Sequence, residues 1–126
     1  MKELRFSERR KVFKSTSLLE LTPISKVGHE INTEGLVTIL FPKFKSARLN
    51  SFIFARKSPF IRLNLDEIGS ESWLLIDGKR NVDEIAQKLT EKFGDKVHPA
   101  SERLGKFLSQ LYNNKYISFT ELLKKE

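Results

Sequence analysis

Residues 66–78 read Asp66-Glu67-Ile68-Gly69-Ser70-Glu71-Ser72-Trp73-Leu74-Leu75-Ile76-Asp77-Gly78, and this stretch has the clearest helix signals in the chain. Asp66 is a suitable N-cap, because its carboxylate can accept a hydrogen bond from a free N–H group in the first turn of a helix. Gly78 can adopt the left-handed conformation that closes a helix. We therefore predict a short helix from Asp66 to Ile76, with Trp73, Leu75 and Ile76 filling the core.

Two more helices are predicted downstream. Asn81 is the expected N-cap of the first, and Glu84 follows three residues later, as in a capping box. Its apolar positions share one face and end before Gly94: Val82, Ile85, Ala86, Leu89 and Phe93. The next helix starts near Pro99 and carries an apolar stripe, Leu104, Phe107, Leu108, Leu111 and Tyr112. Residues 117–119 then form either a short closing strand or an extended tail.

Strand signals come before these helices. Residues 24–31 and 36–41 are two apolar runs separated by a turn at 32–35, which predicts a β-hairpin that stops at Pro42. Residues 60–65 alternate, with Ile61, Leu63 and Leu65 on one face, so we predict a half-buried strand. Residues 43–59 fit a loop, a short amphipathic helix or an extension of the hairpin.

The predicted order is three N-terminal β-strands followed by three α-helices. This content is typical of a small winged-helix-like domain of the α+β class, which we place at residues 21–126. Residues 1–20 are basic and are expected to be a fluctuating helix or a disordered arm.

Charge is distributed unevenly along the chain. Residues 1–65 hold 13 Lys and Arg against 5 Asp and Glu, whereas residues 66–126 hold 10 against 11. The first half is therefore the one expected to meet an anionic partner. The chain has no cysteine, no signal-peptide pattern and no apolar run of membrane-spanning length, so we expect a soluble, cytoplasmic protein.

The sequence offers little for catalysis. His29 and His98 are far apart, and the chain has no cysteine that could join either histidine in a metal site. Asp66, Glu67, Asp83 and Glu84 sit in the first turns of predicted helices, where the helix dipole favours negative charge. There is no phosphate-binding glycine loop, and Ser70 and Ser72 lack the context of a nucleophile. We expect no enzyme activity, no cofactor and no metal.

Binding is the better expectation, and two alternatives bear on it. A nucleic-acid-binding winged helix fits the element order, but the last helix carries few cations for a phosphate-lined groove. The basic, aromatic segment 43–59 could lie on an anionic membrane, or its aromatic side chains could simply pack under a loop.

From Leu65 onward the sequence resembles the PqqD-like family of small peptide-carrier proteins. The residues that carry the resemblance are Leu65-Asp66-Glu67-Ile68-Gly69, Trp73 to Gly78, Val82-Asp83-Glu84-Ile85-Ala86, Leu89, Phe93, Phe107, Leu108, Leu111 and Ile117. It implies a winged-helix domain that recognises the leader of a ribosomally made precursor peptide. The domain would present that peptide to a modifying enzyme, such as a radical S-adenosylmethionine protein. The oligomeric state stays open.

The resemblance also implies where the leader binds, as a strand added beside the third strand and packed on the third helix. An exposed strand edge supplies the backbone groups for such pairing, and a basic half suits an acidic leader. The last helix departs from the family at Asn114, which stands near a usual glycine and can adopt the left-handed conformation. The polar residues of the last helix also fit an ordinary solvent-exposed face. The expected peptide-binding residues are Phe60, Ile61, Arg62, Leu63, Asn64, Leu65, Arg103, Lys106, Phe107, Gln110 and Asn114.

Overall fold

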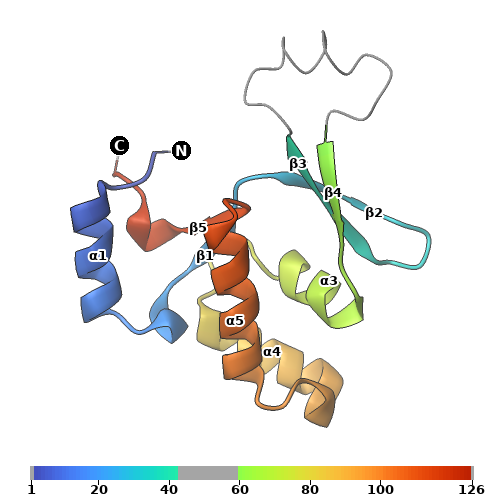
Figure 1. Cartoon of the computed structure of the whole chain (residues 1–126). Coiled ribbons are helices and arrows are strands. Elements are labelled where there is room, and N and C mark those ends of the chain that lie inside the picture. The colour runs from blue at the N-terminus through green and yellow to red at the C-terminus, as the bar shows by residue number, and fades with distance from the viewer. Residues whose placement is uncertain (1, 43–59, 126) are drawn as a thin grey trace, which may run out of the picture.

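Helices and two small antiparallel sheets build the chain, whose computed structural model describes residues 2–42 and 60–125 (Figure 1). The expected α+β class is confirmed. The order of elements differs from the expected one, because a helix precedes the strands and a strand follows the last helix. The elements are α1 (Phe6–Ser15), β1 (Pro23–Ser25), β2 (Gly28–Ile31), β3 (Val37–Pro42), β4 (Phe60–Asn64), α3 (Glu67–Leu74), α4 (Val82–Phe93), α5 (Ala100–Asn113) and β5 (Ile117–Phe119), with 3₁₀ turns at Leu18–Glu20, Gly94–Val97 and Thr120–Leu122.

The larger sheet has the strand order β2-β3-β4. Its hairpin turn is held by Asn32, whose Oδ1 accepts hydrogen bonds from the N–H groups of Glu34 and Leu36. Gly35 has a φ of 81°, a conformation that suits glycine. The predicted hairpin is therefore confirmed at its turn. The segment 43–59, including the expectation of a membrane contact there, lies outside the described residues.

The first predicted strand is in fact two strands. Residues Pro23–Ser25 pair with Ile117–Phe119 in a second sheet, whereas Gly28–Ile31 pair with β3. The switch occurs at Lys26, whose N–H donates to the carbonyl of Tyr116 rather than to β3. One continuous strand was the wrong prediction because the partner of β1 is almost a hundred residues away. The same pairing shows that residues 117–119 are a strand and not a tail.

The helix caps follow the sequence signals closely. Asp66 accepts from the N–H of Gly69 at 2.7 Å, and Asn81 and Glu84 form the expected capping box. α3 ends at Leu74, two residues earlier than predicted, because the chain turns there and Gly78 donates to Pro23 in β1. The residue with left-handed φ after α5 is Lys115, at 67°, and not Asn114, at −91°.

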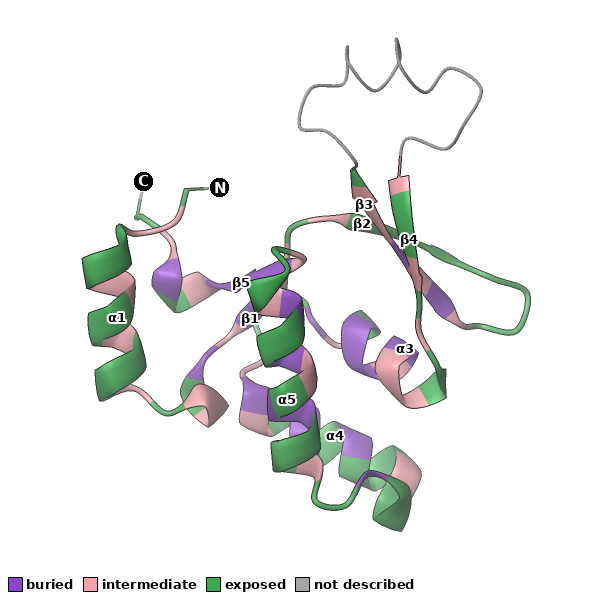
Figure 2. Ribbon diagram, viewed as in Figure 1, coloured by how far each residue is buried: buried purple, intermediate pink, exposed green. Residues whose placement is uncertain are grey.

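The core lies where α3, α4 and α5 meet the two sheets (Figure 2). Trp73 and Ile76 are buried as predicted, whereas Leu75 is only partly buried. The three leucines of the α5 stripe are also buried, while Phe107 and Tyr112 flank them at partly exposed positions. Among the described residues, the apolar side chains below 2% exposure include Leu21, Ile39, Val82, Ile85, Leu108, Ile117, Phe119 and Leu122.

The N-terminal segment is a helix that packs on the body of the protein. Leu4 donates to the carbonyl of Leu122, and Lys124 donates to the carbonyl of Lys2, so the two ends of the chain run side by side (Figure 1). The ring of Phe13 meets Tyr112 of α5 edge-on, with centroids 5.8 Å apart. The structure therefore has a packed helix at Phe6–Ser15, where the sequence left a fluctuating helix or a disordered arm open.

Candidate functional site

β4 is an edge strand of the larger sheet, because β3 pairs with one side of β4 and no other described strand pairs with the opposite side. The N–H of Leu65 donates to the carbonyl of Val37 at 2.9 Å. In an antiparallel pair, residues alternate between pointing their backbone groups at the partner strand and pointing them away. It follows that Ile61 and Leu63 also face β3, whereas the N–H and C=O groups of Arg62 and Asn64 point to the open edge.

A pocket of about 420 Å³ lies where β4 ends and α5 begins. It is bounded by the end of β4, the first turns of α3, one residue of α4, the connection between α4 and α5, and the N-terminal half of α5. Its lining is largely apolar: Asn64, Leu65, Asp66, Ile68, Gly69, Ser72, Leu89, Val97, Ala100, Arg103, Leu104 and Phe107. The pocket is thus continuous with the open strand edge.

The polar side chains at this pocket are held by neighbours. Arg103 Nη1 donates to the carbonyl of Lys96 at 2.6 Å, which fixes the guanidinium beside the α4–α5 connection. Asn64 Oδ1 accepts from Thr38 Oγ1 at 2.8 Å, and Asp66 is used as the helix cap. Arg103 therefore supplies a positive charge at the rim of an apolar cavity.

The pocket and the part of the edge strand from Arg62 onward fall within a stretch that matches a known family. Residues 62–117 match the family model described as Coenzyme PQQ synthesis protein D (PqqD). This part of the chain is PqqD-like. This confirms the family suggested by the sequence, and every residue that lines the pocket lies inside the matched range. A comparison with curated proteins and with solved structures finds no match.

The structure brings only some of the expected peptide-binding residues together. Asn64 and Leu65 from the strand side meet Arg103 and Phe107 of α5 at the pocket. The remaining strand residues, Phe60, Ile61, Arg62 and Leu63, lie along β4 beyond it. Lys106, Gln110 and Asn114 are exposed on α5 and at its C-terminal end, outside the pocket.

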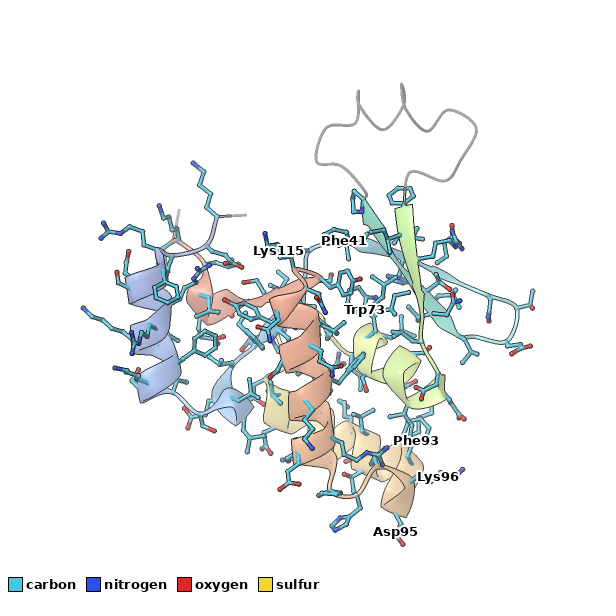
Figure 3. All side chains as sticks on the ribbon, in the orientation of Figure 1. Phe41, Trp73, Phe93, Asp95, Lys96 and Lys115 are labelled. Carbon is cyan, nitrogen blue, oxygen red and sulfur yellow. The ribbon has the colours of Figure 1, made fainter. Side chains whose placement is uncertain are left out.

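One strand residue departs from the predicted burial. Ile61 was expected to point into the core with Leu63 and Leu65, yet half of its surface (50%) is exposed. Ile61 pairs with Phe41, and the ring of Phe41 packs 5.1 Å from that of Tyr116, at the end of the sheet that extends beyond the helices (Figure 3). Ile61 is on the apolar face but past the edge of the core.

Sequence reasoning missed the part of the pocket formed by α3 and by the α4–α5 connection. Gly69, which has no side chain, and Ser72, which has a small one, are three residues apart on α3 and both line this wall. Val97 is buried, and it is the one branched aliphatic side chain in the connection from 94 to 99. These small residues and this single valine were the signals in the sequence that could have indicated this wall of the pocket.

The described residues form no evident catalytic constellation. No set of three or more His, Asp or Glu side chains in residues 2–42 and 60–125 is placed to hold a metal ion. His29 is occupied structurally, since its Nδ1 accepts a hydrogen bond from Trp73 Nε1 at 3.1 Å.

The hydrogen bond from Arg62 lowers the pKa of the Glu30 carboxyl, and backbone N–H groups of Arg80 and Lys79 lower the pKa of Asp77. Both carboxyls are thus kept charged rather than prepared to donate a proton.

No helix in the described ranges has the length and apolar character required to cross a bilayer.

Proposed function

We propose that this chain is a non-catalytic peptide-binding protein that recognises the leader of a ribosomally made precursor peptide and presents it to a modifying enzyme. The observation that carries the proposal is the continuity of the open β4 edge with the apolar pocket on α5, inside the PqqD-like range. The family match is consistent with an accessory protein without catalysis of its own. A radical S-adenosylmethionine protein is the expected kind of partner enzyme.

In the proposed complex the leader extends the sheet as a strand next to β4. Its backbone pairs with the outward-facing groups of Arg62 and Asn64, and such main-chain pairing supplies affinity without reading sequence. Every second side chain of an added strand points to the same face, so an apolar leader residue would enter the pocket beside Phe107. A winged-helix arrangement of the β2-β3-β4 sheet with α3, α4 and α5 is part of this proposal.

Charge adds a preference to this binding mode. Arg103 lies at the pocket, and Lys106 is exposed one residue before Phe107 on the same helix. Both cations favour a leader with acidic residues close to its apolar anchor. The two charges are few for a helix in a phosphate-lined groove, and Arg103 is already bound to the Lys96 carbonyl, so the geometry does not favour nucleic acid.

The proposal is tested by measuring affinity for the leaders of short precursor peptides encoded beside the gene. Fluorescence anisotropy with labelled leaders should show that Phe107→Ala weakens binding roughly tenfold or more, as expected for loss of an aromatic anchor. Phe93→Ala is the matched control, because Phe93 is also a half-buried phenylalanine on a helix but does not line the pocket. Equal affinities of wild type and Phe107→Ala would overturn the proposed groove.

A further inference from the structure

The exposed side of α1 carries two aromatic rings with cations around them. Phe6 is 71% exposed and Phe13 is 43% exposed. Arg10 and Lys14 follow Phe6 by four and eight residues, and this spacing places them on the same side of the helix. This short helix thus presents the Phe6 ring and positive charges together to solvent, while Phe13 lies at the border of the surface, with its ring against Tyr112.

The positive charges at this end of the molecule are largely uncompensated. The side chains of Lys2, Arg10, Lys11, Lys14 and Lys125 have no hydrogen bond or ion pair with any described residue. Two carboxylates of this segment are already engaged, since Glu3 contacts Arg9 and Lys26, and Glu8 binds Arg5, whereas Glu20 is exposed without an ion pair to a described residue. The pairing of the two chain ends brings Lys2 and Lys125 to the same end of the molecule as α1 (Figure 1).

We propose that this basic aromatic surface of α1 binds an anionic lipid surface. Basic helices with exposed phenylalanine lie in the headgroup region of such membranes, with the rings inserted and the cations at the phosphates. Four of the five unpaired cations are lysines, which are depleted at protein interfaces but serve well for diffuse attraction to anionic headgroups. The exposed helix face is convex, so it can lie against a plane of headgroups but forms no cavity for an inserted ligand.

This surface is separate from the proposed peptide groove. Phe107 lines the groove, whereas Tyr112, which contacts Phe13 of α1, lies on another side of α5. Five residues along a helix correspond to a rotation of about 140° beyond one full turn. A peptide in the groove and a membrane at α1 can therefore be bound at the same time, and the lipid proposal does not depend on the peptide proposal.

Co-sedimentation of the full chain with vesicles tests the proposal. Vesicles of phosphatidylcholine with about one third phosphatidylglycerol should bind the protein, whereas pure phosphatidylcholine should not. The triple variant Arg10→Gln, Lys11→Gln, Lys14→Gln should lower the partition coefficient at least about tenfold, because each cation near the surface contributes about fivefold. The matched control is Lys79→Gln, Lys88→Gln, Lys96→Gln, which removes the same charge from exposed positions outside α1 and should retain binding.

A second variant keeps the test independent of charge. Phe6→Ser should also reduce vesicle binding, and because Phe6 is largely exposed the fold should persist, as checked by the emission of the buried Trp73. The proposal is overturned if phosphatidylglycerol vesicles do not bind, or if both triple variants lose binding equally. Tighter binding of a polyglutamate peptide or an oligonucleotide than of the vesicles would also overturn it, since the occupant would then be a protein or a nucleic acid.

Discussion

Two buried serines on α3 show how single side chains connect its elements. Ser70 Oγ accepts a hydrogen bond from the backbone N–H of Val37 at 2.8 Å, so it joins α3 to the first residue of β3. Ser72 Oγ donates to the carbonyl of Ile68 at 2.7 Å, within the same helix. Both serines are about equally buried, at 3% and 2% exposure. Only Ser70 satisfies a backbone group, the N–H of Val37, that has no alternative partner within its own strand.

Ser70→Ala should destabilise the protein more than Ser72→Ala. Removing the Ser70 hydroxyl leaves the buried N–H of Val37 without an acceptor, which costs about 1–3 kcal/mol of the free energy of unfolding. Ser72→Ala should cost less, because the Ile68 carbonyl keeps its helical position and loses only an extra donor. Urea unfolding followed by Trp73 fluorescence measures both. Equal losses in the two variants would contradict this role of Ser70.

Glu3 attaches α1 to the rest of the protein and makes the attachment sensitive to acid. Burial of the Glu3 carboxyl favours its neutral form, but the Ser118 hydroxyl, the hydrogen bond from Arg9 and the charge of Lys26 together outweigh this and lower the pKa. A lowered pKa in the folded state stabilises the protein above the ordinary value of 4.5, and this stabilisation is lost as the pH falls below it.

We therefore expect Glu3→Gln to lower the free energy of unfolding at neutral pH, with the difference from wild type shrinking once the pH falls below 4.5. Glu20→Gln is a suitable control, because Glu20 is exposed and has no ion pair with a described residue. Chemical denaturation across this pH range checks the prediction. A difference that stays constant with pH would assign the effect of Glu3 to packing instead of charge.

At the scale of elements, strand addition at β4 can be tested without disturbing the pairing of β4 with β3. The N–H of Arg62 points to the open edge, so Arg62→Pro removes a group that a bound strand would use and leaves the β3 ladder intact. Arg62→Ala removes the ion pair with Glu30 but keeps the N–H. We expect leader affinity to fall roughly tenfold for the proline variant and little for the alanine variant. Calorimetric titration of both checks this, and equal affinities would argue against strand addition.

Local signals explain why the helices were predictable. The caps at Asp66 and Asn81 depend on residues within three positions, and both were found as predicted. Pairing between distant segments was not predictable in this way. β1 pairs with β5 across almost the whole chain, and Leu4 pairs with Leu122, so the splitting of the first strand and the docking of α1 depend on partners that no local pattern reveals.

The candidate site was predictable only in outline. Alternation identified the strand at 60–65, and the apolar stripe identified the helix that faces it, so Leu65 and Phe107 were both proposed. The wall formed by Gly69, Ser72 and Val97 was not, because small residues and a single valine gain meaning only once three helices are placed around them. Similarly, the exposure of Ile61 follows from where the sheet extends beyond the core.

The whole molecule has two separate surfaces with different chemistry. One is the strand edge and apolar pocket between β4 and α5, and the other is the basic aromatic surface of α1 (Figure 1). α5 lies between them and contributes Phe107 to the first and Tyr112 to the second. Such a separation would let one protein hold a peptide while it is attached elsewhere.

Amide hydrogen exchange with and without a saturating leader peptide tests the central claim most directly. If the leader adds a strand to β4, the amides of Arg62 and Asn64 should exchange markedly more slowly in the complex, because they gain acceptors on the peptide. The amides of Leu63 and Leu65, which already face β3, should change much less. A leader that binds while the Arg62 and Asn64 amides keep their free exchange rates would contradict the account.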